Sequence, residues 1–347
     1  MSSKLSTFQA RRRGRVILFI ATSALLVATT LASILVGQFD LAPGELWPII
    51  TAGPMSATSL DASVVWQIRL PRLVLGLFVG AALGVGGALM QAVFANPLAE
   101  PSVIGVSSGA GVGAAAAIVF GASTFGTITV PVFAFASGTL ATAVVYRLSR
   151  SGGKVRVLNL ILVGIAANAI CGATIALLTF MAPTTAREQI IFWQMGTLAG
   201  ASWAQTGTVV AIVVATLMLA VLLGRKLDIL ALGDQAASHV GINVPRLRMT
   251  AIVLSTLLTA AAVSFAGLIG FVGLVVPHIV RTAVGPSNAV LLPASALGGA
   301  LLIGAGDIFA RTVIPFADLP IGIFTALIGG PTFFFLLRQM LRKNHDL

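Results

Sequence analysis

Ten apolar segments, most of them long enough to cross a membrane, constrain this chain more than any other feature. They cover residues 16–36, 71–93, 103–121, 128–147, 157–181, 204–224, 248–266, 268–283, 289–310 and 320–340. A helix of about 20 apolar residues spans the hydrocarbon core of a bilayer and satisfies its own backbone hydrogen bonds there. The segments therefore predict an all-α polytopic membrane protein with ten transmembrane helices.

Charged residues support this class and predict an orientation. They make up only 9% of the 347 residues, yet they leave a net charge of +11. The basic residues cluster between alternate segments: Arg11, Arg12, Arg13 and Arg15; Arg147, Arg150, Lys154 and Arg156; Arg225, Lys226, Arg246 and Arg248; and Arg338, Arg342 and Lys343. Because cytoplasmic loops are enriched in Lys and Arg, both termini are predicted to be cytoplasmic. Charge distributed in this way predicts no nucleic-acid partner.

The segments define one transmembrane domain, residues 16–340, between short cytoplasmic segments at 1–15 and 341–347. The first span is too long for the hydrophobic region of a signal peptide, so we expect it to remain uncleaved. The weakest boundary lies at 266–268, where almost no loop separates two spans. The single cysteine, Cys171, lies in an apolar segment, and no disulfide is expected.

Residues 267–281, GLIGFVGLVVPHIVR, combine glycines with a proline and a histidine. We expect a helix over 268–283, with the glycines at 267, 270 and 273 on one closely packed face. The predicted orientation puts Gly267 outside and His278 near the cytoplasm. Because three histidines and one cysteine do not suffice for the usual metal site, we interpret His278 as a packing or capping residue. Gly76, Gly80 and Gly84 form a second repeat that predicts close helix packing.

Other motifs weigh against an enzyme and against an ion-coupled carrier. Residues 152–154, GGK, are not a phosphate-binding loop, because Val155 replaces the Ser or Thr that would hold magnesium. Asp307 and Arg311 are four residues apart and are predicted to pair on one helix face. The G-x-G-D string ending at Asp307 resembles intramembrane aspartyl proteases, but that chemistry needs a second carboxylate in a span. An ion-coupled carrier stays as an alternative, disfavoured because the spans lack acidic or polar relays.

Two connections are long enough to carry structure of their own. On the outer side, residues 182–203 include Ile190, Ile191 and Trp193, which are placed to let a short helix lie flat at the membrane interface. On the cytoplasmic side, apolar residues recur at helical spacing within 228–248. Two interpretations of 228–248 stay open: a solvated loop, or a docking helix for a cytoplasmic partner.

Several strings, in their order along the chain, resemble FecCD-type permease subunits of binding-protein-dependent ABC importers for iron chelates, haem and vitamin B12. They are Arg69-Leu70-Pro71-Arg72, Gln91, Asn96-Pro97-Leu98-Ala99-Glu100-Pro101, Gly105-Val106-Ser107-Ser108-Gly109-Ala110, Leu232-Gly233 with Gly241, residues 267–281, Leu292-Pro293, Asp307 to Arg311, and Leu319-Pro320-Ile321-Gly322. The resemblance extends over residues 16–340. It implies a type II ABC importer fold that pairs as a homodimer, with two ATP-binding subunits below and an extracytoplasmic substrate-binding protein above.

The resemblance also implies roles for individual residues. Arg69, Arg72 and Arg311 match outer arginines that pair with carboxylates of the binding protein, and we expect them to snorkel at the lip of the bundle. The alternative is that they only anchor helix ends in headgroups. The positions that form the cytoplasmic gate in that family correspond here to Asn96, Leu98, Val157 and Leu158. Relatives can carry hydroxyl residues at the last two positions, so the polarity of this gate stays open.

Residues 228–248 match the coupling helices that pack against the ATPase. The expected contacts are Leu232, Gly233, Ala236, Ala237, Val240 and Gly241. The implied function is a multi-pass permease of a bacterial cytoplasmic membrane, surrounded by lipid, that moves a ferric siderophore or haem by alternating access. Cobalamin is the alternative cargo. We expect this chain to be no enzyme and to hold no metal or cofactor, with ATP and Mg bound by the partner ATPase.

Overall fold

The computed structural model describes residues 2–39, 41–54, 59–121, 126–151 and 154–345. Ten apolar helices account for most of it: α1 (Ser2–Leu35), α4 (Leu70–Phe94), α5 (Val106–Val119), α6 (Thr129–Leu148), α7 (Val157–Met181), α9 (Trp203–Leu222), α12 (Val244–Ala266), α13 (Val272–Val284), α14 (Asn288–Thr312) and α15 (Ile321–His345). Each corresponds to one predicted span, which confirms the all-α class. Eight of the described helices are long and apolar enough to cross a membrane, whereas α5 and α13 are shorter.

Shorter elements connect these helices. They are α2 (Pro43–Ala52), α3 (Leu60–Ser63), the π-helix η2 (Val64–Arg69), the 3₁₀ turns η3 (Pro101–Ile104) and η4 (Gly126–Ile128), α8 (Thr184–Met195), α10 (Gly224–Leu230) and α11 (Asp234–His239). Strands β1 (Arg150–Ser151) and β2 (Lys154–Val155) pair antiparallel around positions 152 and 153, which lie outside the described residues. Helix α1 begins before residue 16 and α15 continues past 340, so the predicted terminal segments are largely extensions of spans.

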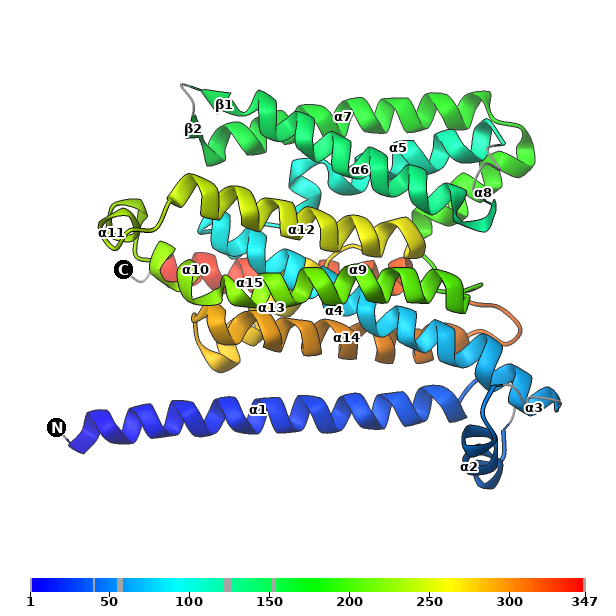
Figure 1. The fold of residues 1–347 in the computed structure, drawn as a ribbon. Coiled ribbons are helices and arrows are strands. Elements are labelled where there is room, and N and C mark those ends of the chain that lie inside the picture. Colours follow the sequence, from blue (N-terminus) through cyan, green and yellow to red (C-terminus); the bar gives the residue numbers. More distant parts are fainter. Residues whose placement is uncertain (1, 40, 55–58, 122–125, 152–153, 346–347) are drawn as a thin grey trace.

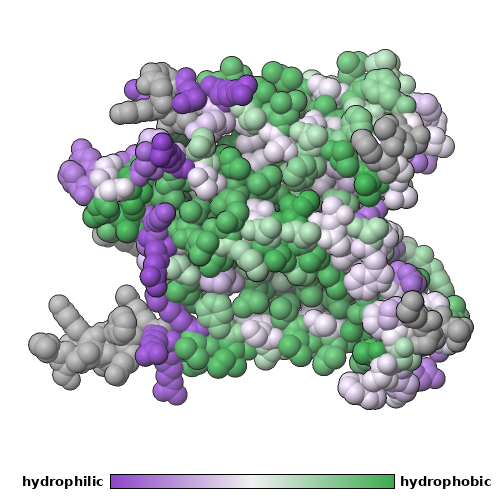
Figure 2. Space-filling view, in the orientation of Figure 1, coloured by the Kyte–Doolittle hydropathy of each residue, from purple (hydrophilic) through white to green (hydrophobic). Residues whose placement is uncertain are grey.

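The long helices run side by side, with α1 along one edge and α7 along the opposite edge (Figure 1). We call the end that holds the first residues of α1 the proximal end, and the opposite end, near α3 and α8, the distal end (Figure 1). Apolar residues cover the visible sides of the bundle, and hydrophilic residues gather towards its two ends (Figure 2). This distribution suits a protein whose sides face lipid.

Helix α4 occupies the centre, between α14 and α12, and nearly all of its residues from Leu73 onwards are buried. Its glycines explain the close approach. A Cβ built on Gly80 would lie 2.1 Å from the carbonyl oxygen of Gly299 in α14, and one on Gly84 would lie 2.3 Å from that of Ser295. The glycine repeat thus serves helix packing within the chain, as predicted.

The prediction of a helix over 268–283 was wrong for its first turn. Helix α12 ends at Ala266 and α13 begins at Val272, so Gly267 and Gly270 lie in an irregular connection and only Gly273 is helical. Gly267 has φ of 70°, and a Cβ there would lie 2.3 Å from the carbonyl oxygen of Trp193. A residue with a side chain does not fit this conformation and this contact, so glycine separates the two helices at this point.

Helix α8 confirms the helix expected in the outer connection, but its apolar side chains do not all lie on its exposed face. Ile190 is 1% exposed and packs into a small apolar cluster with Ala115 and Ala182. Trp193 packs against the main core, and Ile191 is exposed. Helix α8 is therefore packed onto the bundle through Ile190 and Trp193.

Candidate functional site

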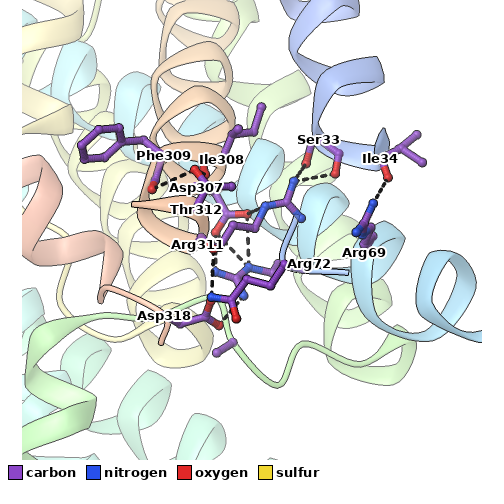
Figure 3. Close-up of polar contacts among 12 residues, drawn as sticks. Ser33, Ile34, Arg69, Arg72, Asp307, Ile308, Phe309, Arg311, Thr312 and Asp318 are labelled. Atoms are coloured by element: carbon purple, nitrogen blue, oxygen red, sulfur yellow. Dashed lines mark hydrogen bonds and ion pairs between the residues drawn. The ribbon is translucent and has the colours of Figure 1, made fainter. Parts of the chain in front are cut away.

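Buried charges join three helices at the distal end of the bundle. Arg72, in the first turn of α4, donates from Nε to both carboxylate oxygens of Asp307 in α14, at 2.9 and 3.2 Å, and its Nη2 lies 2.9 Å from Oδ1 (Figure 3). Its Nη1 donates to Asp318 at 2.7 Å. The side chains of Arg72 and Asp307 are 10% and 4% exposed. A buried arginine needs such paired acceptors, because an unpaired charge at this depth is strongly unfavourable.

The other two distal arginines bind the end of α1. Arg311 donates from Nη2 to the backbone oxygen and the hydroxyl of Ser33, and its Nε lies 3.9 Å from Asp307, which confirms the predicted pairing across one helical turn. Arg69 donates to the carbonyl oxygens of Ile34 and Leu35 (Figure 3). These carbonyls belong to the last turn of α1, where no intrahelical donor reaches them.

The structure thus brings together the three arginines predicted to dock the binding protein, but their side chains point inward. Arg69, Arg72 and Arg311 are 4%, 8% and 6% exposed. The expectation that they snorkel at the lip of the bundle was wrong in this respect, because carbonyls and carboxylates of the same chain take up most of their donors. Sequence reasoning missed Asp318 as a partner of Arg72. A search for carboxylates to balance each arginine near a span would have found it.

The predicted gate residues lie where α4 ends and α7 begins, at the proximal end. Ala95 adopts a left-handed conformation after α4, and the side-chain oxygen of Asn96 then accepts the backbone N–H of Leu98 at 2.9 Å. Leu158, in the first turn of α7, is 65% exposed, whereas Val157 lines a cavity on the other side of that turn. Asn96 and Leu98 therefore form a tight turn, and Leu158 presents an exposed apolar side chain.

Two polar residues connect α4 to the start of α13: Gln91, in the last turn of α4, and Glu100, in the loop that follows it. Gln91 donates to the carbonyl oxygen of Leu274 at 3.3 Å, and its own oxygen accepts from Arg281 at 3.3 Å. Glu100, in the turn before η3, accepts hydrogen bonds from Ser102 and from the backbone N–H of Phe271. Burial raises the pKa of Glu100, and these two hydrogen bonds oppose that shift. Sequence reasoning assigned Glu100 no role.

The connection over 228–248 is helical, which removes the bare loop as an interpretation. Leu232 and Val240 flank α11 and are 76% and 64% exposed. Ala236 is partly buried, and Gly233 and Gly241 are exposed and have positive φ. Ala237 is fully buried in the core of its own chain, so it is not available for contact with a partner. The prediction that Ala237 contacts the ATPase was therefore wrong.

Asp228 ties this connection to α14. Its carboxylate accepts the hydroxyl of Ser287 at 2.8 Å and the backbone N–H groups of Asn288 and Ala289, at the first turn of α14. A carboxylate in this position satisfies unpaired helix N–H groups and complements the positive end of the helix dipole. Helix α14 thus has Asp228 at its proximal end and the Arg72–Asp307 pair near its distal end.

The part of the chain that the structure describes contains no group of three or more His, Cys, Asp or Glu residues placed to hold a metal ion.

Comparisons with known proteins agree over almost the whole chain. The model of the FecCD transport family matches residues 25–339. The chain is 38% identical to a hemin transport system permease protein of Yersinia pestis, over 92% of this chain and 95% of that protein. It is 40% identical to a cobalamin import system permease protein of Halobacterium salinarum, over 85% of this chain and 80% of that protein. A solved structure described as an inward-facing metal-chelate-type ABC transporter shares 33% identity at a TM-score of 0.83, covering 93% of this chain and 99% of that one.

Proposed function

The chain belongs to the FecCD transport family and is a permease of the ABC importer type, and from that premise we propose that it moves a bulky metal chelate across a bacterial cytoplasmic membrane. The observation that carries the proposal is the near full-length similarity to permeases named for hemin and for cobalamin. Haem or a ferric siderophore is one proposed cargo and cobalamin the other, and the relatives support haem and cobalamin equally.

The energy is proposed to come from ATP hydrolysed in a partner. The working assembly is then two copies of this chain, two ATP-binding subunits that hold ATP and Mg, and an extracytoplasmic binding protein. Support comes from the relatives, which are named as permeases of transport systems. The orientation inferred from the basic loops puts the proximal end in the cytoplasm, with both termini.

Movement is proposed to pass from the ATPase to the bundle through the exposed residues around α11. Leu232 and Val240 are the proposed contacts, with Gly233 and Gly241 providing the turns on either side of the helix. Because Asp228 caps α14, displacement of this connection moves the proximal end of α14 with it. Helix α14 is held to α4 by glycine contacts and by Asp307, so the two helices are expected to move as one body.

The gate is proposed to lie at the turn of Asn96 and Leu98 and at the first turn of α7. Leu158 is exposed at the edge of the subunit, and a second copy would bring the same apolar side chains towards a shared axis. An apolar constriction of this kind closes by excluding water. Val157 supports Leu158 from within the subunit.

The binding protein is proposed to dock at the distal end. Arg69, Arg72 and Arg311 are proposed to shape this surface from within, by fixing the ends of α1, α4 and α14 relative to each other. Asp318 is the more exposed partner of Arg72, at 37% of its side chain.

The test is uptake by proteoliposomes that contain the chain together with a candidate ATPase and a candidate binding protein. Haem, a ferric siderophore and cyanocobalamin are offered separately, with and without ATP. We expect ATP-dependent uptake of one cargo class, and the accumulated cargo identifies it. Uptake driven by an ion gradient in the absence of the ATPase would contradict the proposal and favour a secondary carrier.

A further inference from the structure

A cationic cavity opens at the proximal end, lined in part by Val157 of the proposed gate and by Asp234 and Ser238 of α11. It measures about 640 Å³ and lies between the end of α6, the start of α7, α11 and the start of α12. Four arginines line it, Arg150, Arg156, Arg246 and Arg248, and we call it the arginine cup. Its remaining lining is largely apolar, including Leu160 and Ile252.

The charge in the arginine cup is largely uncompensated. Asp234 is the one carboxylate in its lining, and Arg248 already pairs with it through two hydrogen bonds of 2.9 Å. Within the described part of the chain, Arg150, Arg156 and Arg246 have no carboxylate within ion-pair distance. Arg150, Arg156 and Arg246 are exposed, so an anion can reach them from outside, and an anion with several oxygens accepts hydrogen bonds from more than one guanidinium group.

An apolar groove continues from the cup along the seam of α6 and α12. It measures about 200 Å³ and shares Tyr146, Met249 and Ile252 with the cup. Its threonine hydroxyls do not offer polar sites, because each donates to a carbonyl of its own helix; they are Thr139, Thr142 and Thr256. Val253 in the groove is 49% exposed, so the seam opens to the outside of the bundle. Figure 2 shows a mainly hydrophobic surface over these helices, with hydrophilic residues at their proximal ends.

We propose that the arginine cup and this seam together bind one anionic phospholipid. The phosphate lies among Arg150, Arg156 and Arg246, and an acyl chain follows the seam between α6 and α12. A basic pocket between transmembrane helices at the cytoplasmic surface suits an anionic headgroup, and a groove at membrane depth suits its chain. An acidic segment of the ATPase could pair with the arginines of the cup, but it would leave the apolar groove empty. A phospholipid fills both, so the lipid is favoured.

The test is native mass spectrometry of the full-length chain, released from detergent micelles to which phosphatidylglycerol or phosphatidylcholine has been added. The parent should retain phosphatidylglycerol in preference to phosphatidylcholine. With about 1 kcal/mol for each basic residue near an anionic lipid, the variant R150Q/R156Q should lose affinity about 30-fold. The matched control is R225Q/K226Q, which removes the same charge from exposed positions of α10 outside the cup. It should bind the lipid like the parent.

A second variant tests the seam without touching the arginines. Ala143→Trp fills the groove from an exposed position, and lipid binding should weaken although every cation stays in place. Excess inorganic phosphate should not displace the lipid from the parent. Equal losses in the two charge variants would overturn the proposal, as would an unchanged affinity in A143W together with displacement by phosphate. Loss of ATPase binding in R150Q/R156Q with unaltered lipid binding would assign the cup to the partner protein instead.

Discussion

Arg72 and Asp307 are separated by 235 residues in the sequence and form a buried ion pair of 2.9 Å that joins α4 to α14. Asp307 also lies 3.9 Å from Arg311, so one carboxylate faces two guanidinium groups. Asp318 supplies the second negative charge from the loop after α14. The distal ends of the two central helices are thus fixed by electrostatics, while glycine contacts join the same helices along their length.

Asp307→Asn should therefore destabilise the subunit. Arg72 and Arg311 would stay buried with less compensating charge, and breaking a buried pair in this way costs about 3–5 kcal/mol. Unfolding in detergent, followed by tryptophan fluorescence, measures the difference. Glu188→Gln removes one exposed carboxyl in α8 and is the control. Equal stability of D307N and E188Q would show that the pair contributes nothing.

The pairing of Asp307 with Arg311 was predictable, because their spacing puts them on one helix face. The stronger partner of Asp307, Arg72, was not found, because spacing says nothing about which distant helix lies opposite. For the same reason, snorkelling was expected for arginines that the structure buries. Their long side chains reach either solvent or a neighbouring helix. For Arg69 and Arg311 the position of α1 decides which, and for Arg72 the position of α14 does.

The places of the ten apolar helices were predictable from the apolar segments, and eight of the described helices reach crossing length, whereas α5 and α13 are shorter. The break between α12 and α13 was placed correctly at Gly267, but its extent to Phe271 was not foreseen. That extent depends on contacts with a distant element, since Gly267 lies against the carbonyl of Trp193 in α8. Ala237 shows the same limit: its helical spacing was recognised, but burial in its own subunit follows only from the packing of α11.

Gly87→Ala tests the contact between α4 and α13. A Cβ at this position would lie 1.7 Å from the carbonyl oxygen of Gly273, and neither backbone yields without moving a helix. We expect a loss of about 1–3 kcal/mol in the free energy of unfolding, as for other overpacked positions. Gly172→Ala in α7 is the matched control, because a Cβ there meets nothing within 4 Å. It should be neutral or stabilising by up to about 1 kcal/mol, as alanine favours a helix more than glycine does.

Glu100 should give the stability of the subunit a pH dependence. Burial raises its pKa above the ordinary value of 4.5, so the folded chain holds this proton more tightly than the unfolded chain does. The free energy of unfolding contributed by Glu100 therefore falls as the pH rises from 4.5 towards the folded pKa. Glu100→Gln keeps a hydrogen-bond acceptor for Phe271 and removes the titration. Thermal unfolding across this range should show a flatter profile for E100Q and higher stability at neutral pH; identical profiles would contradict the assigned shift.

Mutations of the exposed side chains around α11 can show whether a loss of uptake comes from weaker contact with the ATPase or from a less stable fold. Leu232 and Val240 are 76% and 64% exposed, so Leu232→Asp and Val240→Asp should leave the unfolding of the isolated subunit nearly unchanged. If these side chains enter a groove of the ATPase, a buried carboxylate there should weaken its association and reduce ATP-dependent uptake at least about 10-fold. Ala237→Asp, one turn away and fully buried, should instead lower stability before any partner is added. Association with the purified ATPase, measured alongside unfolding for all three variants, distinguishes the two effects. Normal ATPase binding by both exposed variants would move the coupling contact to another part of the proximal surface.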